Sequence, residues 1–144
     1  MSVEVKNPLA IAVVYLWIGF VCAISFMEAW LKFRAPDVNI QIGLGIGRLV
    51  FSALNKAEWV FVTAIFFSFF VPKQSLFLIN NLFYYIPFIL LLIQTIWILP
   101  ALDKRAEMHI HKMEVEASLL HIYYIVMEAI KVISLLIFSF KQFK

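Results

Sequence analysis

Charged residues are scarce in this sequence, and their scarcity excludes an ordinary soluble domain. Asp, Glu, Lys and Arg make up 15% of the 144 residues, whereas soluble globular domains carry about 25%. Apolar residues make up 64% and fall into long runs, which predicts an all-α integral membrane protein with the lipid bilayer as its main partner. The net charge of +3 comes from Lys and Arg beside these runs, so we infer no nucleic-acid partner.

Cysteine and glycine are sparse too, and each shortage removes a class of site. The lone Cys22 has no second cysteine for an internal disulfide, and its apolar surroundings are typical of a packing residue. Gly43, Gly45 and Gly47 alternate without forming a nucleotide-binding fingerprint, and no predicted strand precedes them. No nucleophile lies at a spacing from a base that indicates catalysis, so we expect neither an enzyme nor a cofactor.

Four apolar stretches are present, and a helix needs about 20 such residues to cross a hydrocarbon core. They predict one four-helix membrane domain over residues 1–144, with spans at about 8–30, 52–71, 80–100 and 117–139. Residues 34–47 are then a flexible or interfacial connection between the first two spans.

The last apolar stretch carries charge where lipid disfavours it. Only 11 uncharged residues precede Glu128 and only 9 follow Lys131, so neither piece spans a bilayer alone and the whole must cross as one helix. Glu128 then lies near the midplane, where a charge costs about 2.5–3.5 kcal/mol on insertion scales and marks a candidate functional residue. His121, Tyr124, Glu128 and Lys131 share one helical stripe, and the last two are spaced to form an ion pair.

The second span shows the same conflict between charge and length. Glu58 and Lys73 enclose only 14 uncharged residues, about 21 Å of helix against a hydrocarbon core of about 30 Å. The span must reach back to about Ser52, which draws Asn55 and Glu58 into the membrane on one face, with Arg48 on nearly the same side. The alternative is that bilayer thinning keeps Glu58 in contact with water at the interface.

Because four spans alternate in direction, their polar residues gather at one membrane side, which we call side B. We predict a binding or transport pocket that opens to side B and is closed towards side A by apolar residues such as 66–71. The predicted pocket residues are Glu28, Arg48, Asn55, Glu58, Gln94, His121, Tyr124, Glu128 and Lys131. Besides Glu58, two of them have alternatives: Glu28 also fits an interfacial carboxylate, and Gln94 also fits a structural bond between helices.

Basic residues indicate the orientation. Seven Lys or Arg lie beside side B and four beside side A, so the positive-inside rule predicts a cytoplasmic side B and two external termini. We expect a multi-pass protein of a bacterial inner membrane. Small membrane proteins commonly complete a pathway or ligand set by pairing, so we also predict a homo-oligomer, with a partner membrane subunit as the alternative.

The hydrophilic segment 103–116 contains the most suggestive metal pattern. His109 and His111 are two positions apart and do not share a helical face. Glu107, His111 and Glu114 would share one, which leaves a surface metal site as the alternative to a solvated helix face. We favour the solvated face.

Several short motifs carry a family resemblance: Lys32-Phe33-Arg34-Ala35-Pro36, Gly47-Arg48-Leu49-Val50-Phe51, Leu54-Asn55 with Glu58, Leu102-Asp103-Lys104-Arg105, and the stripe of His121, Tyr124, Glu128 and Lys131. With them the chain resembles a family of small bacterial four-span membrane proteins, and its layout is distantly similar to the copper-resistance D-like and transmembrane-protein-205-like group. The resemblance implies the four-span fold and no established activity. No Met or Cys cluster lies in the spans near His121, so it implies no copper site.

Three functions are compatible with these patterns. The first is a small transporter or channel for a proton, a cation or a small solute, based on Glu58, Glu128 and a histidine that exchanges protons near neutral pH. The second is a metal- or haem-binding membrane protein, in which an oligomer must supplement the single histidine within the spans. The third is a non-catalytic assembly subunit whose polar stripe pairs with a partner helix. We favour the first.

Overall fold

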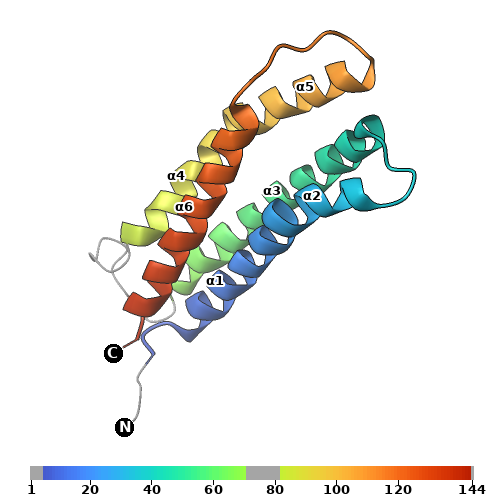
Figure 1. Cartoon of the computed structure of the whole chain (residues 1–144). Coiled ribbons are helices and arrows are strands. Elements are labelled where there is room, and N and C mark those ends of the chain that lie inside the picture. The colour runs from blue at the N-terminus through green and yellow to red at the C-terminus, as the bar shows by residue number, and fades with distance from the viewer. Residues whose placement is uncertain (1–4, 71–81, 144) are drawn as a thin grey trace.

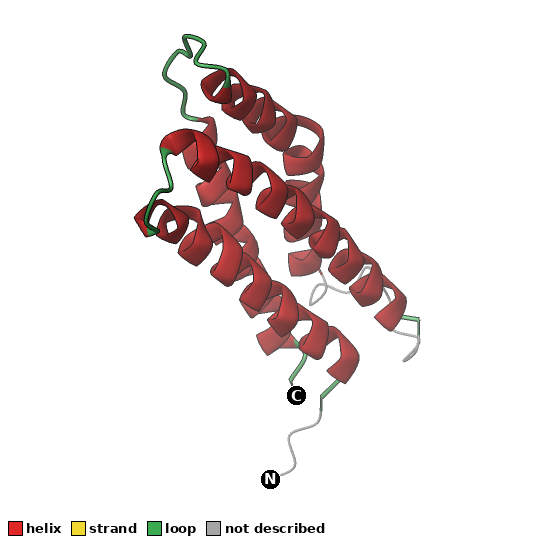
Figure 2. Cartoon of the chain, turned by 90° about the vertical axis from the view of Figure 1, so that its right-hand side faces the viewer, coloured by secondary structure: helices red, strands yellow, loops and turns green. Residues whose placement is uncertain are grey.

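The described part of the fold consists of long helices, with loops at 35–39 and 111–119 (Figures 1 and 2). The computed structural model describes residues 5–70 and 82–143, and the prediction of an all-α chain is confirmed for them, since neither range contains a strand. Within these two ranges, four helices are long and apolar enough to cross a membrane: Pro8–Arg34, Ile40–Ser68, Leu82–Ile110 and Leu120–Lys141. They alternate in direction, and an isolated bridge between Val5 and Phe143 joins the two ends of the described chain.

The first long helix is not uniform along its length. Asn7 caps its start by accepting a hydrogen bond from the Ala10 amide, and it ends where Ala35 adopts an extended backbone before Pro36. Its parts are α1 (Pro8–Val21), a π-helical segment (Cys22–Glu28), α2 (Ala29–Leu31) and a 3-10 turn (Lys32–Arg34). The predicted span at 8–30 lies within it.

The second long helix, α3 (Ile40–Ser68), begins about twelve residues earlier than the sequence indicated. Residues 40–47 of the expected flexible or interfacial connection are therefore helical, so the flexible alternative was wrong there. The Asn39 side chain caps α3 by accepting the Ile42 amide at 2.9 Å. Glycine disfavours helix by about 1 kcal/mol relative to alanine, but Gly43 allows a close approach here: a Cβ at this position would collide with the ring of Phe33.

The third long helix continues beyond the predicted span at 80–100, whose first two residues lie outside the described chain. Its parts are α4 (Leu82–Ile93), a second π-helical segment (Gln94–Ile98) and α5 (Leu99–Ile110). The helix ends at Ile110, and Lys112 has a positive φ of 56° in the turn that follows. Glu114 therefore lies in a loop, and the proposed shared helical face of Glu107, His111 and Glu114 was wrong.

The fourth long helix, α6 (Leu120–Lys141), begins three residues later than predicted. The loops 35–39 and 111–119 lie at the same end of the molecule, which corresponds to the predicted side B (Figure 1). Towards the opposite end the interior is an apolar core drawn from all four long helices. Its largest buried side chains include Trp17, Ile65, Phe69, Leu91, Leu135 and Phe138.

The apolar closure towards side A has a different composition from the one predicted. Within 66–71, Phe69 is buried in the core, whereas Phe66, Phe67 and Phe70 are exposed. Position 71 lies outside the described residues. The exposed phenylalanines belong to a largely apolar outer surface, as expected for helices that face lipid rather than water.

Candidate functional site

An ionic triad is buried between α3 and α6. Lys131 donates a hydrogen bond to Glu58 of α3, and its Nζ lies 2.8 Å from Oε1 of Glu128, one turn back on α6. Each of the three residues is at most 1% exposed. The helical stripe predicted from the sequence thus brings Glu128 and Lys131 together as expected, and α3 adds the second carboxylate.

Two uncharged side chains, one from each of the other two long helices, donate hydrogen bonds to the carboxylates of the triad. Trp17 of α1 donates its indole N–H to Oε1 of Glu58 at 2.8 Å, and Gln94 donates its amide to Oε1 of Glu128 at 2.7 Å. Oε2 of Glu128 is buried, and no described residue forms a hydrogen bond with it. With both carboxylates ionised and Lys131 protonated, the triad carries one uncompensated negative charge.

A pair of aromatic rings lies at the side B end of the triad. Tyr124, buried one turn before Glu128, packs edge-to-face on Phe51 with ring centroids 5.1 Å apart. The Tyr124 hydroxyl lies 3.4 Å from the hydroxyl of Ser25, in the π-helical segment of the first helix. Phe51 also lines the space beyond this pair, whereas Tyr124 and the three triad residues do not.

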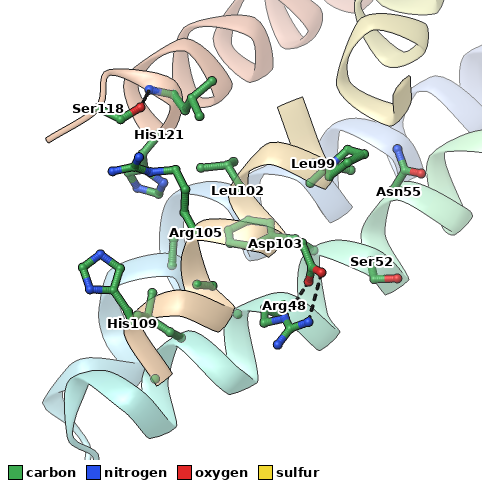
Figure 3. Close-up of a pocket in the computed structure, with 18 of the residues that line it drawn as sticks. Arg48, Ser52, Asn55, Leu99, Leu102, Asp103, Arg105, His109, Ser118 and His121 are labelled. Carbon is green, nitrogen blue, oxygen red and sulfur yellow. Dashed lines mark hydrogen bonds and ion pairs between the residues drawn. The ribbon is translucent and has the colours of Figure 1, made fainter. Parts of the chain in front are cut away.

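That space is a cavity of about 720 Å³, towards side B (Figure 3). Its walls come from the end of the first helix, the first half of α3, the third helix from Thr95 to His109, and the start of α6. The polar side chains that line it are Lys32, Arg48, Ser52, Asn55, Thr95, Asp103, Arg105, His109, Ser118 and His121.

Two polar contacts tie α3 to the third helix along this cavity. Arg48 forms a two-pronged ion pair with Asp103, with Nε–Oδ1 and Nη2–Oδ2 distances of 2.6 and 3.0 Å (Figure 3). Deeper in, the Thr95 hydroxyl oxygen accepts hydrogen bonds from Asn55 at 2.9 Å and from Trp59 at 3.0 Å. Asn55 is thus held by a structural contact as well as lining the cavity.

The nine predicted pocket residues do not form one pocket. Five of them lie in or directly against the buried triad: Glu58, Gln94, Tyr124, Glu128 and Lys131. Three line the cavity: Arg48, Asn55 and His121. The ninth, Glu28, pairs with Lys32 at 3.2 Å beside the cavity and does not line it.

Sequence analysis missed Trp17 as a triad donor and Lys32 as a cavity residue. Trp17 lies in a continuous apolar run and carries no pattern that separates it from a packing residue. The signal for Lys32 was its i,i+4 spacing from Glu28, which is typical of a helical ion pair. Within the two described ranges, no group of three His, Cys, Asp or Glu side chains is placed to hold a metal ion.

Comparisons with protein-family models, with curated proteins and with solved structures found no match. The resemblance to small bacterial four-span membrane proteins therefore stays a prediction. Function has to be argued from the chemistry of the triad and the cavity.

Proposed function

We propose that the protein is a multi-pass integral membrane protein of a bacterial inner membrane that acts as a small transporter. In this proposal the triad of Glu58, Glu128 and Lys131 carries a proton, and the cavity holds a small solute. The observation that carries the proposal is the charge of the triad: two buried carboxylates share one buried ammonium.

The charge imbalance supports proton binding. An isolated buried charge is costly in a medium of low dielectric, and one added proton makes the triad neutral. The unbonded Oε2 of Glu128 is an available acceptor for that proton. The second carboxylate adds a buried charge that the single ammonium does not balance, and proton binding removes the cost of that charge.

The arrangement along the helices supports a pathway with one accessible side. The cavity lies towards side B and none of the three triad residues lines it, while the apolar core lies towards the opposite end of the molecule. Movement of a proton to side A then requires rearrangement of the core, as expected for a transporter rather than for an open channel. The orientation with side B cytoplasmic belongs to the same proposal.

The assembly-subunit alternative has less support. It requires the polar stripe of α6 to face a partner helix, but Glu128 and Lys131 are 0% exposed and are paired within this chain. The predicted homo-oligomer stays a prediction, and its interface would involve other residues.

Proton flux into proteoliposomes tests the proposal. Purified protein is reconstituted with a pH-sensitive dye inside, and a membrane potential drives proton entry. We expect flux from the natural chain, and its loss in Glu58→Gln and Glu128→Gln, because glutamine keeps the shape and removes the titrating proton. Glu107→Gln, at an exposed position of α5, serves as the matched control and should keep full flux. Absence of flux from the natural chain, or undiminished flux in both triad variants, overturns the proposal.

A further inference from the structure

The cavity carries an excess of positive charge. Lys32, Arg48 and Arg105 line it, against a single carboxylate, that of Asp103. Arg48 already engages Asp103 through two hydrogen bonds. Lys32 is paired with Glu28, whose carboxylate lies 3.2 Å from its Nζ beside the cavity. Arg105 is therefore the cation of the lining that has no carboxylate partner among the described residues, and a ligand that neutralises it would be anionic.

Three donor-bearing side chains on one wall are largely uncommitted. Among the described residues, Arg105 donates only to the backbone carbonyl of Glu116, although a guanidinium has five N–H donors. The side chains of His109 and His121 form no hydrogen bond with any described residue. All three line the same cavity, from α5 and the first turn of α6 (Figure 3).

The remainder of the lining is mostly apolar. It includes Phe33, Leu44, Phe51, Leu99, Leu102 and Leu120. The cavity volume of about 720 Å³ falls within the range of about 300–1,000 Å³ that is usual for small-molecule sites. A small inorganic anion would leave this apolar surface uncovered, whereas a ligand with an anionic head and an apolar chain would cover it.

We propose that the cavity binds an amphipathic anion. Its carboxylate or phosphate head lies against Arg105, His109 and His121, and its apolar chain lies along Phe51 and the leucines of α3 and α5. Arginine suits such a head because its planar fork matches the geometry of carboxylate and phosphate oxygens. The inference rests on the proposed function in one respect, since it names the class of solute that the transporter would hold.

Binding is measured by the melting temperature of the protein purified in a neutral maltoside detergent. The probes are octyl phosphate, inorganic phosphate and octyltrimethylammonium, each titrated over the same concentrations. We expect octyl phosphate to raise the melting temperature, inorganic phosphate to need at least tenfold higher concentration for the same shift, and the cation to have no effect. Equal potency of inorganic phosphate would indicate a site for free phosphate, and an equal shift with the cation would indicate unselective apolar binding; either result overturns the proposal.

Two variants test whether the ligand binds at the wall formed by Arg105, His109 and His121. Arg105→Gln should weaken octyl phosphate binding at least fivefold, and Lys104→Gln, its exposed neighbour that does not line the cavity, should leave binding unchanged. Arg105 also anchors the loop through Glu116, so His121→Gln is a second variant that keeps this bond and should weaken binding at least twofold. Unchanged binding in both cavity variants overturns the proposal.

The same samples separate this inference from the proposed transport. Proteoliposomes of neutral lipid without octyl phosphate report proton flux alone, and the melting experiment reports anion binding alone. Flux without binding would refute only the amphipathic ligand. Binding without flux would refute only the transporter.

Discussion

Trp17 holds the carboxylate of Glu58 from across the interface between α1 and α3, with an indole nitrogen to Oε1 distance of 2.8 Å. Both side chains are buried, so neither group has water as an alternative partner. The contact fixes Glu58 where Lys131 also reaches it, and it makes the first helix part of the triad's support.

Replacing Trp17 with phenylalanine should test the strength of this contact. Phenylalanine retains most of the ring packing and removes the N–H donor. We expect the free energy of unfolding to fall by about 1.5–3 kcal/mol, the range for hydrogen bonds to charged groups. Reversible unfolding in mixed micelles measures the change. Trp97→Phe, at a position 57% exposed, is the control and should leave stability unchanged. A loss in the control as large as that in Trp17→Phe would argue against a specific role for the bond.

Removing the shared cation should destabilise the protein more than removing either carboxylate. Lys131→Met leaves Glu58 and Glu128 buried without their common partner, and breaking a buried pair in this way costs about 3–5 kcal/mol. Sequence analysis identified only the Glu128 pair, which implies rescue by a single second change. Because Glu58 depends on the same ammonium, we expect Glu128→Gln to rescue Lys131→Met partly, and a triple variant with Glu58→Gln as well to rescue it further. Complete rescue by Glu128→Gln alone would show that Glu58 is not energetically coupled to Lys131.

The Arg48–Asp103 pair should contribute little to stability and should depend on salt. Its side chains are 30% and 51% exposed, so water and ions screen the attraction. We expect Arg48→Glu to lower the melting temperature at low ionic strength through repulsion of Asp103, and Asp103→Arg added to it to restore the natural value. High salt should remove most of the difference. A swap that fails to restore the melting temperature would mean that these two side chains do not interact as a pair.

Cysteine labelling should establish the orientation. In a Cys22→Ser background, cysteines at Asp37 and Met113 lie in loops at the same end of the molecule, and both should be protected from an impermeant reagent in intact cells. A cysteine at Gln74, outside the described residues, should be labelled from outside. Labelling of positions 37 and 113 in intact cells, with protection at 74, would reverse the assignment.

Some of this structure follows from local rules, and some depends on tertiary contacts. The Glu128–Lys131 pair was predictable because residues three apart on a helix are neighbours. The four described helices that are long and apolar enough to cross a membrane were predictable because apolar length is read directly from the sequence. The start of α3 was not predictable, because Gly43, Gly45 and Gly47 disfavour a helix locally, while the close packing of Gly43 against Phe33 is a tertiary contact.

The division of the predicted pocket into a triad and a separate cavity was not predictable either. It depends on how the helices pack: Phe51 and Tyr124, 73 positions apart in the sequence, are in contact, yet only Phe51 lines the cavity. Neither residue lies in a sequence pattern that predicts a boundary between the triad and the cavity. From the sequence, both rings could be placed on inward faces near the same end, but the distance between them could not be predicted.

The two π-helical segments have a consequence for how the chain tolerates changes in length. In each, a backbone N–H reaches back five residues, from Ala29 to the carbonyl of Ile24 and from Leu99 to that of Gln94. Trp17 and Ser25 are both buried, although a regular α-helix would set residues eight positions apart about 80° from one another. A π-helical turn contains one residue more than an α-helical turn, and this extra residue compensates for the rotation between the two positions. Deleting one exposed residue there, such as Ala23, would therefore shorten the helix while keeping its inward face in register, whereas the same deletion within α3 would turn everything beyond it away from its partners.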